Sequence, residues 1–170
     1  MRIIISDSSC LIDMHKGGLL RAMFRLPFQF VIPQPLFKEE LERISEEEKQ
    51  EMIALGMEVI VLPGEQVSQA QIYFNENRLL VLNYCFALVL AEETEESILF
   101  TADKALRQLA DSKNIETHGI LWGIDMLEEH TDIAPQTLLD ALLAFEADPQ
   151  VWLPEDELKT RIRRLRRKCR

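Results

Sequence analysis

The chain lacks the features of several protein classes. It has no run of 18 apolar residues, so no membrane-spanning helix is expected. It does not begin with a basic segment followed by a long apolar one, so no signal peptide is expected either. The three cysteines are scattered, which is typical of a reduced, cytoplasmic protein. Zinc-ligand spacing and a Gly-x-x-x-x-Gly-Lys loop are both missing, which argues against a zinc site and excludes a P-loop NTPase.

Charge is distributed unevenly along the chain. The formal net charge is −10, yet residues 159–170 hold eight Lys or Arg and no acid, so residues 1–158 carry −18. An acidic body argues against broad, nonspecific binding of nucleic acid by the body itself. The basic tail continues an amphipathic pattern in which Leu158, Ile162 and Leu165 share one face. This tail could bind RNA or dock on the acidic body.

Strand-like and helix-like segments alternate. Short apolar, β-branched or aromatic runs predict five strands, over residues 3–6, 29–32, 58–62, 98–101 and 115–117. Helices are predicted between and after them, at residues 8–15, 19–26, 35–43, 45–55, 65–77, 79–91, 103–110, 119–129, 135–147 and from 154 onward. Alternating strands and helices indicate an α/β fold with a mostly parallel sheet and right-handed crossovers.

Two of the strand-like runs are followed by an acid at a helix start. Asp7 follows the first strand and Asp103 follows the fourth. The carboxyl ends of parallel strands form the ligand crevice of an open sheet, so these side chains should converge. Converging carboxylates repel one another unless a divalent metal or a basic partner neutralises them. Because Mg²⁺ prefers oxygen ligands and activates bound water, this arrangement predicts metal-dependent chemistry.

Four motifs in this order resemble the PIN-domain family over roughly residues 1–130. They read Asp-Ser-Ser-x-Leu-Ile-Asp, Val-Ile-Pro…Leu-Phe-Lys-Glu-Glu-Leu, Cys-Phe-Ala-Leu-Val-Leu-Ala and Leu-Phe-Thr-Ala-Asp-Lys-Ala-Leu. The resemblance implies a three-layer α/β/α fold with a parallel sheet, and leaves residues 131–170 as a C-terminal helical extension with a basic tail. It also implies Mg²⁺- or Mn²⁺-dependent hydrolysis of RNA, often by the VapC-type toxin of a toxin–antitoxin pair.

The resemblance assigns roles to individual residues. Asp7, Glu40 and Asp103 match the family's metal-binding and catalytic acids. Ser9 and Thr101 match hydroxyl residues that would orient ligands or phosphate from behind. The partners implied are RNA, a small antitoxin protein and a second copy of the chain, with no membrane.

The chain departs from the family at one acidic position. The family usually has an Asp immediately before the segment that begins at Cys85, and Tyr84 stands there instead. A phenol is uncharged at neutral pH and is a poor ligand for a hard cation. Two functions therefore stay open: a metal-dependent endoribonuclease, and a catalytically impaired module that binds RNA or another partner.

The acids also have simpler interpretations. Asp7 and Asp103 could serve only as helix N-caps. Either member of the Glu39–Glu40 pair could point inward, and the family pattern favours Glu40. Asp13 is expected on a solvated helix face rather than at a site.

Overall fold

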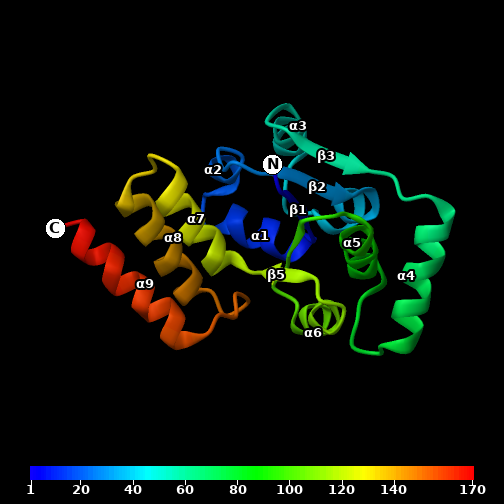
Figure 1. Cartoon of the computed structure of the whole chain (residues 1–170). Coiled ribbons are helices and arrows are strands. Elements are labelled where there is room, and N and C mark those ends of the chain that lie inside the picture. The colour runs from blue at the N-terminus through cyan, green and yellow to red at the C-terminus, as the bar shows by residue number, and fades with distance from the viewer.

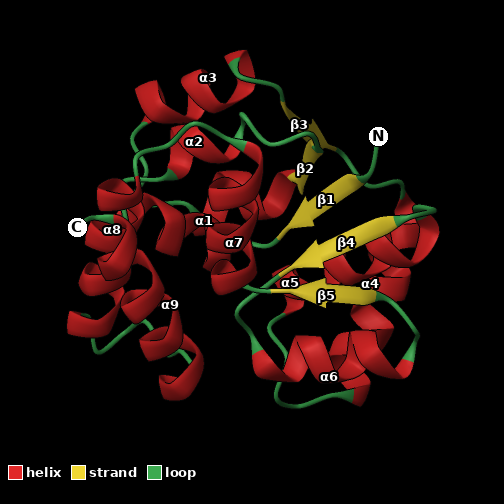
Figure 2. Ribbon diagram, turned by 60° about the vertical axis from the view of Figure 1, so that its left-hand side comes forward, coloured by secondary structure: helices red, strands yellow, loops and turns green.

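A computed structural model describes residues 1–170 and shows an α/β sheet with helices packed around it (Figures 1 and 2). The five strands are all parallel, in the order β3-β2-β1-β4-β5. Their bounds are β1 (Ile3–Ser6), β2 (Gln29–Pro33), β3 (Met57–Ile60), β4 (Ser97–Phe100) and β5 (Glu116–His118). The predicted three-layer α/β/α fold with about five strands is confirmed.

Helices connect the strands and continue beyond the last one. They are α1 (Ser8–Lys16), α2 (Leu20–Met23), the π-helix η1 (Leu36–Glu40), α3 (Glu46–Ala54), α4 (Gly64–Glu76), α5 (Leu82–Glu93), α6 (Lys104–Ser112), α7 (Ile120–His130), α8 (Pro135–Ala147) and α9 (Glu155–Lys168). None of them combines the length and the apolar character that a membrane span needs.

Two predicted helices differ from the structure. The α-helix expected over residues 35–43 is a five-residue π-helix, Leu36–Glu40. Its wider turn places Glu40 at the C-terminal end of the element. The apolar helix expected from Leu79 begins at Leu82, because Leu79 and Val81 belong to an exposed connection whose last residue has extended backbone.

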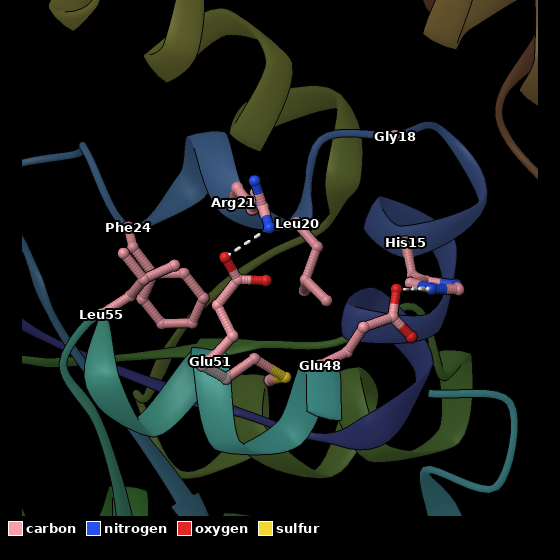
Figure 3. Close-up of a pocket in the computed structure, with 9 residues that line it drawn as sticks. His15, Gly18, Leu20, Arg21, Phe24, Glu48, Glu51 and Leu55 are labelled. Atoms are coloured by element: carbon pink, nitrogen blue, oxygen red, sulfur yellow. Dashed lines mark hydrogen bonds and ion pairs between the residues drawn. The ribbon is translucent and has the colours of Figure 1, made fainter. Parts of the chain in front are cut away.

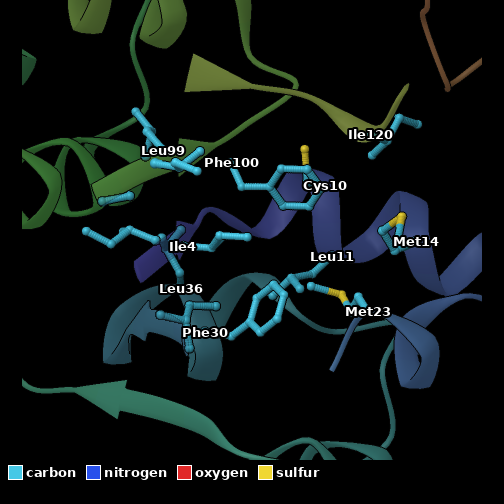
Figure 4. Packing of buried hydrophobic residues seen from close by; sticks show 14 of the residues in the cluster. Ile4, Cys10, Leu11, Met14, Met23, Phe30, Leu36, Leu99, Phe100 and Ile120 are labelled. Carbon is cyan, nitrogen blue, oxygen red and sulfur yellow. The ribbon is translucent and has the colours of Figure 1, made fainter. Parts of the chain in front are cut away.

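The central strands are buried on both faces, as parallel strands covered by helices must be. Ile4 and Ile5 of β1 and all four residues of β4 are buried, and helix side chains such as Leu11 and Met14 pack onto them (Figure 4). β1 pairs with β4 so that Ser6 lies opposite Phe100. This register brings Asp7 and Thr101, the next residue of each strand, out at the same edge of the sheet.

The last two helices pack together beside α7, at the opposite end of the molecule from α4 (Figure 1). Phe145 of α8 lies against Gly17 at the end of α1, where an added Cβ would approach its ring to 2.7 Å. A side chain at this position would therefore push α8 away. Leu158, Ile162 and Leu165 of α9 are buried, as the amphipathic pattern predicts.

Ion pairs fasten the basic tail to the body. Arg161 forms a bidentate pair with Asp125 of α7, with its shortest N–O distance at 2.6 Å. Arg164 bonds both Asp125 and Glu128, and Lys168 lies 2.7 Å from Glu128. Docking on the acidic body, one of the two alternatives for the tail, is thus what the structure shows for these three cations.

Replacing Leu165 with Ala should destabilise the protein, because its side chain is fully buried between α9 and the body. We expect the free energy of unfolding to fall by about 3 kcal/mol, the usual cost of truncating a buried Leu. Urea unfolding followed by circular dichroism measures this. Arg166→Ala, at an exposed position of the same helix, should change stability by less than about 0.5 kcal/mol. Equal effects of the two variants would mean that α9 is not docked in solution.

Candidate functional site

Asp7 lies at the carboxyl end of β1 and is fully buried. It is the N-cap of α1, and its Oδ1 accepts hydrogen bonds from the Ser9 and Cys10 backbone N–H groups at 3.0 and 3.4 Å. The Ser9 hydroxyl donates to the same oxygen at 2.6 Å, and the Thr101 hydroxyl donates to Oδ2. Burial raises the pKa of Asp7 to about 6, although these four donors oppose the shift.

The same hydroxyls join Asp7 to the loop after β4. Ser9 Oγ accepts a bond from the backbone N–H of Ala102 at 3.0 Å, and Thr101 Oγ1 accepts one from that of Asp103 at 3.0 Å. Asp103 is itself the N-cap of α6, where its Oδ1 accepts from the Leu106 N–H at 2.7 Å. Both Asp7 and Asp103 are therefore N-caps as well as candidate site residues. The Ser9 and Thr101 hydroxyls connect Asp7 to the backbone of the loop that carries Asp103.

Glu40 is connected to the start of α5. Asn83 Nδ2 donates to Glu40 Oε1 at 2.7 Å and to Glu39 Oε2 at 3.1 Å. Glu39 is exposed, whereas Glu40 is partly buried and its charge acts on Tyr84. Glu40 is the inward member of the pair.

Tyr84 stands among the candidate acids. It is partly buried in the first turn of α5, and burial raises the pKa of its hydroxyl to about 12. The nearby Ser8 hydroxyl lowers this pKa. The negative charges of Asp7, Glu40 and Asp103 raise it further. The phenol is thus neutral at physiological pH, and all three acids are close enough to act on it.

A cleft of about 440 Å³ opens beside Tyr84 and Asp103, and neither Asp7 nor Glu40 lines it. Ser9, Tyr84 and Asp103 line it, and so does Asp13, which the sequence analysis expected on a solvated face. Burial raises the pKa of Asp13 to about 6, with Lys16 opposing the shift. The signal that could have identified Asp13 is its helical spacing of i+4 from Ser9, which puts both side chains on one face of α1.

The acids do not form a ready site for a divalent metal. No three His, Cys, Asp or Glu side chains are grouped so that they could hold an ion. Asp7 already accepts three hydrogen bonds at Oδ1 and one at Oδ2, so only Oδ2 keeps a lone pair for a metal. Tyr84 adds volume but no charge. The residues as arranged therefore do not fit the oxygen-rich ligand set that Mg²⁺ needs.

A smaller cavity, of about 180 Å³, lies between α1, α2 and α3 (Figure 3). A hydrogen bond and an ion pair cross it: His15 Nε2 lies 2.9 Å from Glu48, and Arg21 Nη2 lies 2.6 Å from Glu51. None of the candidate acids lines this cavity. Its polar groups already satisfy one another, so the cleft at the strand ends is the better functional site.

Asp7→Asn should change how the stability of the metal-free protein depends on pH. The folded state holds the Asp7 proton up to about pH 6, whereas the reference pKa is 3.8, so ionisation between these values lowers wild-type stability as pH rises. Between pH 4 and pH 7 the free energy of unfolding of Asp7→Asn should therefore gain roughly 2 kcal/mol relative to wild type. Chemical denaturation in EDTA at several pH values measures this difference.

Asp140→Asn, which removes an exposed carboxylate of α8, serves as the matched control. A difference between Asp7→Asn and wild type that does not vary with pH would contradict the proposed cost of burying the charge. A large loss of stability at neutral pH would show that Asp7 acts mainly as a cap.

Comparison with known proteins agrees with this architecture. A family model named DUF3368 and described as a PIN domain matches residues 3–167. No match was found among curated proteins. The crystal structure of a predicted subunit of tRNA methyltransferase from Methanocaldococcus jannaschii is similar at 14% identity and a TM-score of 0.36, covering 91% of this chain and 92% of that one. A similarity this weak does not bear on function. The family model spans nearly the whole chain, and this protein belongs to the PIN-domain family.

Proposed function

We propose that this protein is an RNA-binding PIN domain whose hydrolytic activity is low or absent. The observation that carries the proposal is the position of Tyr84, a neutral phenol among Asp7, Glu40 and Asp103. A ring there occupies space that a metal ion and its waters would need, and it supplies no charge to hold them. The absence of any group of three ligands in the structure supports the same conclusion.

RNA as the ligand is supported by the family and by the local charge. PIN domains have a nuclease-like fold and commonly bind RNA. Arg163, Arg166 and Arg167 of α9 are exposed and have no carboxylate partner within 4 Å, unlike the docked cations of the same helix. These free cations offer contacts to phosphates although the body is acidic.

A second function, metal-dependent endoribonuclease, is favoured by a different observation. The charges of the three candidate acids act together on one hydroxyl, and Asp13 lines the same cleft. In this function Asp7, Glu40 and Asp103 would hold Mg²⁺ or Mn²⁺, with Ser9 and Thr101 positioning them.

A toxin role with a small antitoxin protein, association with a second copy and a cytoplasmic location remain predictions from the family resemblance. So does the division of the chain at residue 130.

Tyr84→Asp should bind Mn²⁺ more tightly than wild type, since it adds a hard oxygen ligand and removes the ring. We expect an increase in affinity of about tenfold or more, equivalent to about 1.4 kcal/mol. The same change should lower stability in EDTA, because it removes buried ring area and adds charge beside three acids. Isothermal titration calorimetry and thermal unfolding measure the two effects.

Tyr84→Asn is the matched control, because it removes the ring without adding charge. Its Mn²⁺ affinity should rise much less than that of Tyr84→Asp, because an amide oxygen carries no charge. Tight binding of Mn²⁺ by wild type itself would contradict the proposed function and favour the endoribonuclease.

Wild type should bind single-stranded RNA in EDTA and leave it uncleaved when Mn²⁺ is added, because the metal site is incomplete. Fluorescence anisotropy measures the binding, and gel analysis of an end-labelled RNA measures cleavage. Cleavage by wild type that is lost in Asp103→Asn would establish the second function instead. Cleavage by Tyr84→Asp alone would show that the remaining site is competent and that Tyr84 is what blocks it.

A further inference from the structure

A groove of about 450 Å³ adjoins the cleft that Asp103 and Tyr84 line. It lies where the first turns of α6 and α7 face the segment that leads into α9. Ala102 and Trp152 line both the groove and the cleft, so the two hollows lie side by side. An extended ligand held in the groove could therefore reach the cleft without leaving the surface.

Aromatic rings line this groove. The His118 and Trp122 rings stack at a centroid distance of 4.3 Å and an interplanar angle of 10°. Trp152 lines the same groove, and it is 80% exposed and has no aromatic partner. An indole left in water at this position is costly in free energy and is suited to stacking on a planar ligand.

Two cations of the groove have no acidic partner. No carboxylate lies within 4 Å of Lys104 or Arg107, whereas Asp125 and Glu157 of the same groove both pair with Arg161. The groove therefore carries unpaired positive charge inside a strongly acidic body.

Arg107 is held at the groove wall. Its Nη2 donates to the carbonyl of Thr101 at 3.0 Å and lies against Gly119, where an added Cβ would approach it to 2.8 Å. Its other N–H groups remain available to a ligand, because a guanidinium carries five. Gly119 is also the N-cap of α7, so this helix start has no side-chain cap.

We propose that this groove binds a base of single-stranded RNA. In this arrangement the base stacks on Trp152, and Lys104 and Arg107 contact the flanking phosphates. The proposal rests on the RNA binding proposed above and assigns it a site. Stacking needs an unpaired base, so the groove selects single strands over duplexes.

The charge pattern favours RNA over a peptide partner. A planar, uncharged ring system joined to negative groups matches an exposed indole beside two unpaired cations. An acidic peptide would meet the cations but would leave the indole without a planar partner. A basic peptide would be repelled by Lys104 and Arg107.

Trp152 fluorescence reports the stacking directly. Trp122→Phe leaves Trp152 as the single tryptophan of the chain. Titration of this variant with a short oligoadenylate RNA in EDTA should quench the emission. Inorganic phosphate should leave the emission unchanged, because it carries no base. A duplex RNA of similar length should quench it much less. Equal quenching by phosphate or by duplex would overturn base stacking at this site.

Affinity measurements test the same residues. Trp152→Ala should bind the oligoadenylate about tenfold more weakly than wild type. Lys104→Gln should weaken binding and reduce the slope of log affinity against log salt by about one, as loss of one phosphate contact predicts. The matched controls are Leu79→Ala and Arg78→Gln, which alter exposed residues of the α4–α5 connection that line neither hollow. Both should bind as wild type does.

The outcomes separate the two proposals. If wild type binds the oligoadenylate and Trp152→Ala binds it equally well, the groove is not the base site and RNA binding still stands. If wild type does not bind the oligoadenylate and the emission of Trp122→Phe does not change, the proposed RNA binding is wrong and the groove has no such ligand. Circular dichroism of each variant shows whether it is folded.

Discussion

The functional face depends on one buried carboxylate. Asp7 emerges from the centre of the sheet and accepts four hydrogen bonds, which together hold the start of α1 and the loop after β4 in fixed positions. Burying a charge without such partners would be prohibitively unfavourable. The donors reduce the cost of burial but do not remove it, since the pKa of Asp7 stays raised at about 6. A pKa perturbed in this way is common among residues of functional sites.

This network determines what faces the cleft. Because the Ser9 hydroxyl bonds both Asp7 and the backbone of Ala102, α1 is oriented with Ser9 and Asp13 toward the cleft. The Thr101 hydroxyl donates to Asp7 and accepts a hydrogen bond from the backbone N–H of Asp103, which holds Asp103 in place. Asp7 uses its lone pairs for this structural role, which leaves little capacity for a metal. The arrangement that builds the site thus also limits its chemistry, and Tyr84 limits it further.

Electrostatics divides the surface by function. The acidic body would repel RNA, but pairing neutralises many of its acids, as where α9 docks on Asp125 and Glu128. Five cations without an acidic partner lie on the exposed face of α9 or at the groove beside the cleft: Arg163, Arg166, Arg167, Lys104 and Arg107. A polyanion can approach the protein along these regions even though the net charge is negative.

The sequence by itself determined the fold, because short apolar runs and helical patterns alternate strongly enough to predict five parallel strands and the order of the helices. It also placed Asp7 and Asp103 at strand ends, since that depends only on local pattern and parallel topology. The tertiary structure decided what depends on contacts between distant segments. The strand register places Ser9 within hydrogen-bonding distance of Ala102. Glu40 ends a π-helix rather than the expected α-helix. The orientation of α1 places Asp13 at the cleft. The groove at Trp152 is formed by segments as far apart as α6 and α9, so no local pattern predicts it.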